Sequence, residues 1–261
     1  MILLDVGGTF IKCEDGRQVP IASGGSRDQI AGALRQAVGD PGGVRCIGIA
    51  IPGPFDYKNG IFLMKHKFAS VFGENFRELA GIPETVPVKY EHDVTAVLRG
   101  LVRMMDLKDS NCALVTLGTG LGYAYALKGE VQYDEKGSPV RSLWNRPWGN
   151  GILEDILSGR GIRAAYAGKT GDMGQNAYNI AMLAKDGAAA AIETYREAGE
   201  VLGKALKTEV EELGLDTLLM GGQISKSLDL MLEPLQAALP GVRILLSPEG
   251  AVFEGLRSLF D

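Results

Sequence analysis

The sequence offers little to suggest a membrane or a nucleic acid as a partner. No window comes near the ~18–20 apolar residues that span a bilayer, so no transmembrane segment is expected. The net charge is −5 at pH 7 and no basic run offsets it, which argues against nucleic acid. The N-terminal apolar stretch is too short for a signal peptide, so we expect a cytoplasmic protein.

Cysteine and histidine are also scarce. The chain has three cysteines, Cys13, Cys46 and Cys112, and two histidines. Because the cysteines are odd in number, widely spaced and set in apolar, strand-like segments, they favour buried thiols over a disulfide or a metal site. The content of 46% apolar and 23% charged residues is ordinary for a globular enzyme of one large or two medium domains.

The first informative segment is an apolar strand that ends in an acidic residue and turns at once through two glycines, Asp5-Val6-Gly7-Gly8-Thr9. Glycine lets backbone amides approach a ligand closely, so such a turn can cradle a phosphate. Asp5 would then act through a magnesium ion held largely by its own waters, and Lys12 would add a point charge. Taken alone, a plain hairpin turn explains the same residues.

An apolar strand followed by a glycine turn occurs twice more. The turn residues are Gly118, Thr119 and Gly120 in one case and Gly221, Gly222 and Ser225 in the other. The first of these turns leads into another apolar strand, so the order of strand, glycine turn and strand repeats. A repeat of this kind favours a chain built from two similar halves.

Strand and helix patterns alternate along the chain. Continuous apolar runs predict buried strands, among them 44–51, 112–118 and 217–220. Helical periodicity predicts helices at 27–38 and 93–105, three between 151 and 213, one at 226–238 and one from 250 onward. This alternation indicates α/β layers. We expect one domain of residues 1–108 plus the C-terminal helix 248–261, and a larger one of 109–247.

Asp93 is the candidate for acid–base chemistry. It follows a predicted strand at 86–90, comes directly after His92 and opens a predicted helix. A carboxylate at the C-terminal edge of a strand faces the crevice where α/β folds bind ligands, and it can take a proton from an attacking hydroxyl. A helix N-cap would also explain Asp93, and His92 alone is more typical of a strand end than of a catalyst. Glu154 opens another predicted helix, where the dipole favours a carboxylate whatever its function.

These segments together resemble the ROK family of sugar kinases and repressors, within the actin-like ATPase superfamily with its ribonuclease H-like fold. The first two glycine turns are similar to the two phosphate loops of the family, and 220–225 to its adenosine segment. Residues 47–54 match its sugar-side strand and turn, and 151–159 look like the end of its metal motif. All of these segments stand in the order and spacing of the family.

The resemblance implies an ATP-dependent sugar kinase in which two similar α/β domains enclose a nucleotide cleft. A sugar hydroxyl would attack the γ-phosphoryl group, with Asp93 as the catalytic base and Asp5 near magnesium. Substrate contacts are implied for Pro52, Gly53, His92, Asp93 and Glu154. Family members are commonly dimers, so a homodimer is expected.

The chain departs from the family on the sugar side. His92 replaces an asparagine that binds sugar hydroxyls, and 137–148 lack the Glu, His and cysteine cluster that bind sugar and zinc. A structural zinc site is therefore not expected. A site that reads hydroxyls discriminates by roughly 1–3 kcal/mol for each buried group left unpaired, so an ordinary hexose is in doubt as the substrate.

The same segment carries two tryptophans and two arginines, namely Trp144, Trp148, Arg141 and Arg146. Aromatic faces stack on sugar rings and arginine forks bind carboxylate or phosphate, which suggests an acidic or already phosphorylated sugar with Arg141 among its contacts. Alternatively, the tryptophans pack the loop that zinc would otherwise hold. A non-catalytic sensor of nucleotide or sugar is the second functional hypothesis. A DNA-binding repressor is disfavoured because no helix-turn-helix precedes the first strand.

Overall fold

The computed structural model describes all 261 residues, which form two compact units. The first unit comprises Met1–Asp106, Val131–Val140 and Glu249–Asp261, and the second comprises Leu107–Glu130 and Arg141–Pro248. The division expected from sequence put 131–140 into the second domain, whereas this segment packs with the first unit. The backbone N–H of Tyr57 donates to the carbonyl of Lys136 at 3.3 Å, and Tyr133 interacts with Arg99. These local contacts could not be read from a pattern of apolar residues.

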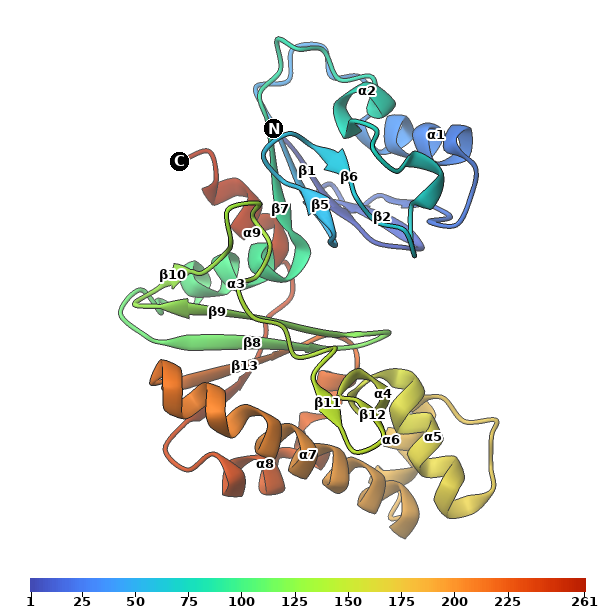
Figure 1. Ribbon diagram of the computed structural model, residues 1–261, viewed down its shortest axis with the longest axis vertical. Helices are drawn as coiled ribbons and strands as arrows, with labels where there is room; N and C mark the ends of the chain where they lie inside the picture. The colour runs from blue at the N-terminus through green and yellow to red at the C-terminus, as the bar shows by residue number, and fades with distance from the viewer. The chain divides into compact units, whose positions relative to one another are not determined.

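The first unit is built on a five-stranded sheet with the order β3-β2-β1-β4-β7 (Figure 1). Its strands are β1 (Ile2–Val6), β2 (Phe10–Cys13), β3 (Gln18–Pro20), β4 (Ile47–Ile51) and β7 (Val88–His92). The first three strands form an antiparallel meander, and β4 and β7 run parallel to β1. Every residue of the central strand β4 is buried, which accounts for its unbroken apolar sequence.

Helices and short strands complete this unit. They are α1 (Arg27–Val38), β5 (Phe55–Asp56), β6 (Ile61–Phe62), the 3₁₀ helix η1 (Ala69–Val71), α2 (Phe76–Ala80), α3 (Asp93–Met104) and α9 (Ala251–Ser258). Helix α1 begins with a capping box in which Ser26 and Gln29 bond to each other's backbone amides. Its apolar face packs on β1 and β4 in one core, which also holds the rings of Phe55 and Phe62.

Helices α3 and α9 lie side by side (Figure 1), although α3 ends at Met104 and α9 begins only at Ala251. Glycines allow this close crossing. A Cβ atom added to Gly100 would lie 2.7 Å from the carbonyl carbon of Ala251 and 2.9 Å from the amide nitrogen of Gly255. The backbones of α3 and α9 are therefore in direct contact. Through this contact the C-terminal helix packs in the first unit, where it was expected from the sequence.

The second unit repeats the strand pattern of the first. Its sheet has the order β10-β9-β8-β13-β14, with strands β8 (Cys112–Leu117), β9 (Leu121–Leu127), β10 (Glu130–Val131), β13 (Thr217–Gly221) and β14 (Arg243–Leu246). Strand β9 is antiparallel to β8, while β13 and β14 are parallel to it. Together with the small hairpin β11 (Pro147–Trp148) and β12 (Gly151–Ile152), this confirms the predicted mixed α/β class with two related sheets.

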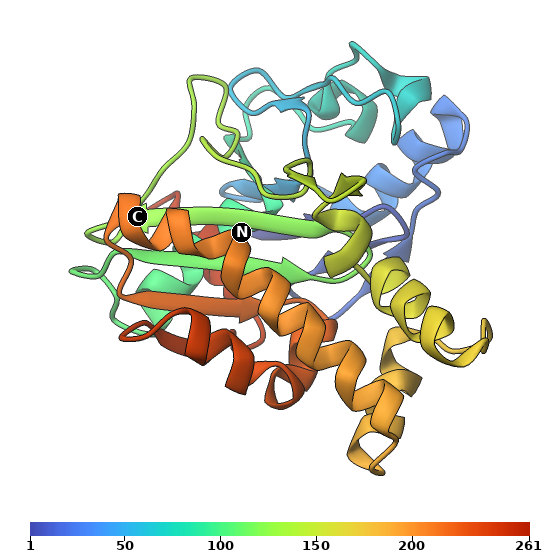
Figure 2. The ribbon, with the colours of Figure 1, turned by 60° about the horizontal axis from the view of Figure 1, so that its bottom comes forward.

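The helices of the second unit differ in number from the expectation. They are α4 (Glu154–Leu157), α5 (Gly159–Thr170), α6 (Ala177–Lys185), α7 (Ala189–Leu213), the 3₁₀ helix η2 (Ile224–Leu230) and α8 (Leu232–Ala238). Four helices rather than three lie before residue 214, because Ser158 is extended between α4 and α5. The helix predicted at 226–238 is divided at Met231 into η2 and α8, and η2 itself is kinked at Ser227. Figure 2 shows the long helix α7 lying across one face of the sheet.

The three cysteines are buried and unpaired, as predicted. Burial raises the pKa of the Cys112 thiol to about 12, so this group stays protonated at neutral pH. Among the helices, none combines the length and the apolar character needed to cross a membrane.

Candidate functional site

The carboxyl ends of three parallel strands bring together the predicted residues of the first unit. Strand β1 delivers Asp5, β4 leads into Pro52 and Gly53, and β7 ends at His92. The sheet register pairs Asp5 with Ala50 and Ile51 with His92. A Cβ atom on Gly53 would lie 3.4 Å from Cδ2 of His92, so this turn passes directly over the imidazole. These residues are far apart in the sequence, and the parallel strands bring them together at one edge of the sheet.

The turn of Gly7, Gly8 and Thr9 is the hairpin loop between β1 and β2. The Gly7 N–H donates to the carbonyl of Phe10 at 2.9 Å, and a Cβ atom on Gly7 would lie 3.0 Å from that oxygen. Thr9 is exposed at the tip of the turn, and its carbonyl accepts from Ile21 N–H at 2.9 Å. Residues 7–9 thus form a hairpin turn, which was one interpretation of their sequence. Whether the turn can bind a ligand depends on the side chains around it.

Asp5 and Lys12 face each other across this hairpin. They are register partners, and Lys12 Nζ lies 3.4 Å from Asp5 Oδ2. Burial raises the pKa of the Asp5 carboxyl, Lys12 opposes that effect and the negative charge of Asp93 adds to it. Two carboxylates therefore lie close enough to repel each other, an arrangement that favours a cation between them.

Asp93 is the first residue of α3, and the N-cap of that helix is His92 rather than Asp93. The Val94 N–H donates to Asp93 Oδ1 at 2.8 Å, and His92 Nδ1 lies 2.9 Å from the same oxygen. Burial acts to raise the pKa of the Asp93 carboxyl, but His92, the Val94 amide and Lys67 together hold it below its ordinary value. Since the side chain is 37% exposed, a ligand can still reach the carboxylate.

Lys67 is a residue of this region that the sequence reasoning did not single out. A Cβ atom on Gly8 would lie 3.8 Å from its Cε, so the lysine stem runs beside the glycine turn. The signal in the sequence was the basic cluster Lys65-His66-Lys67 in an otherwise acidic chain. That signal is weak, because most short basic clusters are solvated surface.

The two glycine turns of the second unit lie next to each other at the carboxyl ends of β8 and β13. Gly222 has φ of +84°, and a Cβ atom there would lie 2.8 Å from the carbonyl carbon of Leu117, the residue before Gly118. Ser225, fully buried, donates its hydroxyl to the carbonyl of Gly221 at 2.5 Å and so holds that turn together. No atom lies within 4 Å of a Cβ position on Gly118, while its own N–H donates to the carbonyl of Gly120 at 3.0 Å and its carbonyl accepts from the Gly159 N–H at 2.8 Å.

Glu154 lies at the second glycine turn, and the substrate contact that the resemblance implies for it stays a prediction. Its Oε2 accepts from the Leu121 N–H at 3.0 Å, and a Cβ atom on Gly120 would lie 2.8 Å from the same oxygen. Thr119 stands exposed at the tip of this turn. The carboxylate of Glu154 therefore braces the turn in addition to opening α4.

Arg141 and Arg146 both bind one buried glutamate. Arg141 Nη1 lies 2.9 Å from Glu209 Oε2 and 2.8 Å from Glu212 Oε2, and Arg146 contacts Glu209 Oε1. Only 3% of the Glu209 side chain is exposed. These ion pairs raise the pKa of Arg141 and account for the positive charge of the segment. A contact of Arg141 with the substrate stays a prediction.

The tryptophans of that segment differ from each other. Trp144 is 47% exposed, whereas Trp148 packs against the core of the second unit. Trp148 therefore packs its loop, which is one of the two roles considered for the tryptophans, the other being stacking on a sugar ring. Across the whole chain, no group of three or more His, Cys, Asp or Glu side chains is arranged to hold a metal ion.

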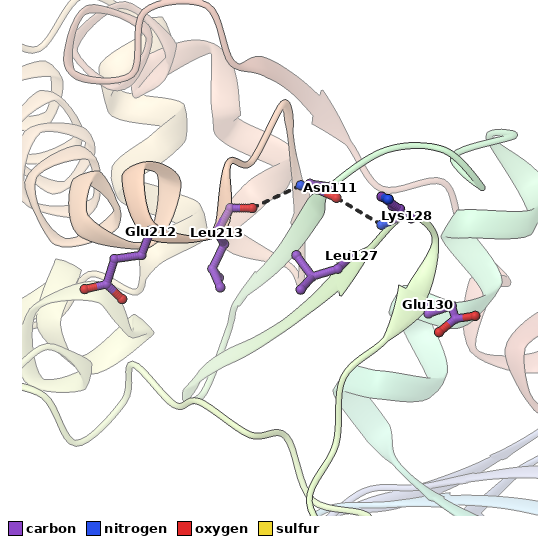
Figure 3. Close-up of a pocket in the computed structure, with 6 residues that line it drawn as sticks. All are labelled: Asn111, Leu127, Lys128, Glu130, Glu212 and Leu213. Atoms are coloured by element: carbon purple, nitrogen blue, oxygen red, sulfur yellow. Dashed lines mark hydrogen bonds between the residues drawn. The ribbon is translucent and has the colours of Figure 1, made fainter.

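A cavity of about 410 Å³ in the second unit lies away from the glycine turns (Figure 3). It surrounds Asn111, which precedes β8, whereas Gly118 follows the other end of that strand. Asn111 accepts from the Lys128 N–H at 2.9 Å and donates to the carbonyl of Leu213 at 3.1 Å, as the dashed lines in Figure 3 mark. The amide of Asn111 therefore joins loops and is not offered to a ligand.

No protein-family model and no curated protein sequence matches this chain. Solved structures do match. A ROK family glucokinase from Streptomyces griseus, in complex with glucose and AMPPNP, has a TM-score of 0.79 at 22% identity over 99% of this chain and 98% of its own. The chain has the ROK fold. A ROK hexokinase from Thermus thermophilus matches this fold with a TM-score of 0.71 at 21% identity over 98% of this chain and 95% of its own.

The ROK fold also occurs in a transcriptional regulator, a homologue of the E. coli MLC protein. It matches with a TM-score of 0.77 at 17% identity, over 99% of this chain and 80% of its own. The fold thus confirms the predicted architecture, while identities this low leave the activity to be argued from the residues.

The residues present fit the groups that this fold would hold. Magnesium keeps several of its waters and needs one or two carboxylates plus phosphate oxygens. Asp5, 21% exposed and held beside a glycine turn, meets that need without a dedicated metal cage. The space beside Gly118 and the glycine turn next to Asp5 would suit phosphate groups, which bind to backbone amides that the turns leave unpaired.

Proposed function

We propose that this protein is a member of the ROK family that transfers the γ-phosphoryl group of ATP to a hydroxyl of a sugar or sugar derivative. The observation that carries the proposal is the pair of Asp5 and Asp93 at one sheet edge, with a glycine turn beside the first and a helix start beneath the second. The ROK fold supports it. A regulator would need no carboxylate poised at a strand end beside a phosphate turn.

In this proposal Asp93 binds the acceptor hydroxyl and takes its proton as the new oxygen–phosphorus bond forms. His92 orients the Asp93 carboxylate from 2.9 Å, and Pro52 and Gly53 bound the space above the imidazole. A low pKa keeps Asp93 ionised, so it accepts the hydrogen bond of the hydroxyl before it accepts the proton. Catalysis then depends mainly on the alignment of the hydroxyl with the phosphoryl group.

We assign the nucleotide to the glycine turns. In the first unit the turn residues Gly7, Gly8 and Thr9 would bind phosphate with Lys12, while Asp5 would hold magnesium, which neutralises phosphate charge when bound. In the second unit the assigned residues are Gly118, Thr119, Gly120, Gly221 and Gly222, with Ser225 and Glu154 as residues that hold these turns in shape. A cytoplasmic homodimer stays a prediction.

The test is phosphorylation of a panel of neutral, amino, acidic and phosphorylated sugars by wild type, Asp93→Asn and Asp28→Asn. Asp28 is the matched control, because it also lies in the first turn of a twelve-residue helix of the same unit and is 93% exposed. We expect Asp93→Asn to lower kcat about 10²–10⁴-fold with the KM for ATP nearly unchanged. Turnover equal to that of Asp28→Asn would refute the general base.

The second candidate is a sensor that binds nucleotide or sugar without turnover. The relatedness in fold to a ROK regulator favours it, as does the replacement of a sugar-binding asparagine by His92. Wild-type protein that binds ATP by calorimetry but phosphorylates no member of the panel would support the sensor and reject the kinase.

A further inference from the structure

Lys67 lies beside the first glycine turn and has no role in the site as described so far. Its Cε and Cδ lie 3.8 and 3.9 Å from the position of a Cβ atom on Gly8. A Cβ atom at residue 8 would therefore be in van der Waals contact with the lysine stem. The stem passes over the bare backbone at the point where the turn would contact a phosphate.

Backbone hydrogen bonds fix the position of Lys67 relative to the turn. The Ser23 N–H donates to the carbonyl of Gly8 at 3.1 Å, and the Phe68 N–H donates to the carbonyl of Ser23 at 2.6 Å. Phe68 is fully buried and has φ of +53°, which is uncommon for a bulky residue. The core thus holds the residue after Lys67, and two hydrogen bonds tie that residue to the glycine turn.

The charges near Lys67 leave its ammonium group available. Lys12 pairs with Asp5, and the neighbouring Lys65 lies over the ring of Phe72 at 5.3 Å. Lys67 itself makes no ion pair within 4.0 Å, and its positive charge acts on the carboxylate of Asp93. A half-buried cation thus runs beside the phosphate turn in the same compact unit as the proposed base, on which its charge acts.

We propose that Lys67 is a further catalytic residue, whose ammonium group contacts a γ-phosphoryl oxygen during transfer. The proposal rests on the kinase function proposed above. The bond between the γ-phosphorus and the oxygen bridging to ADP breaks, a bond from the acceptor oxygen forms, and the hydroxyl proton passes to Asp93. Negative charge on the phosphoryl oxygens needs fixed positive charge nearby, and lysine supplies a compact point charge for phosphate.

The alternative ligand for Lys67 is an anionic group on the acceptor. The structure favours the phosphoryl group, because the lysine stem runs along Gly8 of the phosphate turn rather than along Pro52 and Gly53. The two possibilities predict different kinetics. A contact to the phosphoryl group affects kcat for every acceptor, whereas a contact to an acceptor anion affects KM for anionic acceptors only.

The test compares Lys67→Met and Lys67→Arg with Lys65→Met, which removes the same charge two positions away. We expect Lys67→Met to lower kcat about 10²–10³-fold for neutral and anionic acceptors alike, with the KM of the acceptor nearly unchanged. Lys67→Arg should recover part of that loss, and Lys65→Met should behave as wild type. An unchanged kcat in Lys67→Met, or a loss confined to the KM of anionic acceptors, would overturn the proposal.

A second measurement needs no acceptor and separates this proposal from the kinase function. Calorimetry would compare the affinity for Mg·ADP with and without aluminium fluoride, which mimics the phosphoryl group in transfer. We expect aluminium fluoride to tighten binding to wild type and Lys65→Met by at least tenfold more than to Lys67→Met. Equal tightening in all three proteins would overturn the role of Lys67. Normal tightening in a wild type that phosphorylates no sugar would reject the sugar acceptor instead.

Discussion

Replacing Gly100 by alanine should destabilise the protein, although alanine is the better helix former. The residue lies inside α3, where a Gly→Ala change ordinarily gains about 1 kcal/mol of stability. At this position the new Cβ would lie 2.7 Å from the carbonyl carbon of Ala251, where ordinary contact requires 3.4 Å or more. Helix α9 must therefore move away from α3.

The expected size follows from what surrounds the new methyl group. Both nearest neighbours, Ala251 and Gly255, present backbone atoms that cannot rotate out of the way. Overpacking typically costs about 1–3 kcal/mol, and a rigid neighbour places this case at the upper end. After subtraction of the gain in helix propensity, we expect a net loss of about 2 kcal/mol, or about 4–8 °C in Tm for a protein of this size.

Gly32→Ala is the matched control. Gly32 lies inside α1, a helix of the same length in the same unit, is exposed, and has no atom within 4 Å of its Cβ position. The control should therefore gain about 1 kcal/mol, or about 2–4 °C in Tm. Thermal unfolding followed by circular dichroism measures both. A Tm for Gly100→Ala equal to or above that of Gly32→Ala would refute the close crossing of α3 and α9.

Two other substitutions test the charges. Burial raises the pKa of Asp5 in the folded protein above its ordinary value of 3.8. Ionisation of Asp5 therefore destabilises the fold as the pH rises from 3.8 through the raised pKa. Asp5→Asn should therefore have a larger free energy of unfolding than wild type at pH 7, and this difference should shrink toward pH 3.8. The variant should also lose magnesium-dependent activity. Urea titrations at both pH values measure the difference in stability, and equal differences at the two pH values would contradict the reasoning. Glu209→Ala should lower the free energy of unfolding by about 3–5 kcal/mol, because it leaves Arg141 and Arg146 without their buried partner. Glu212→Ala removes a partner of Arg141 that is 54% exposed, so it should lower the free energy of unfolding in urea by at most about 1 kcal/mol. Similar losses for Glu209→Ala and Glu212→Ala would argue against a buried ion-pair cluster around Glu209.

The strands and their glycine turns were predictable from sequence because each depends on local chemistry. An unbroken apolar run such as Ile47–Ile51 is needed by a strand buried on both faces, and the turn at Gly7 needs a residue without Cβ. The break between α4 and α5 was not predictable, because Ser158 interrupts a helical pattern without any proline or glycine before it. Helix ends of this kind depend on the packing of neighbouring elements.

The candidate site was predictable in part for the same reason. Asp5 lies near the end of β1 and Asp93 directly follows β7, so their position at one sheet edge follows from the parallel strand order. Lys67 lies in an irregular segment whose path is set by the burial of Phe68 and by a hydrogen bond to Ser23, neither of which leaves a periodic signal. Arg141 was singled out for its chemistry as a contact for an anionic ligand, and its ion pair with Glu209 of α7 was not predictable because the two residues are far apart in sequence.

The assignment of 131–140 and 249–261 to the first unit has a consequence for the order of events during synthesis. The ribosome completes Met1–Asp106 long before it delivers α9, which covers α3. Until then the nascent first half exposes the small-residue face of α3 around Gly100, while the second unit is already being made. A fragment that ends after Asp106 would share this defect, so the first half is not expected to be recovered as a well-folded piece without α9.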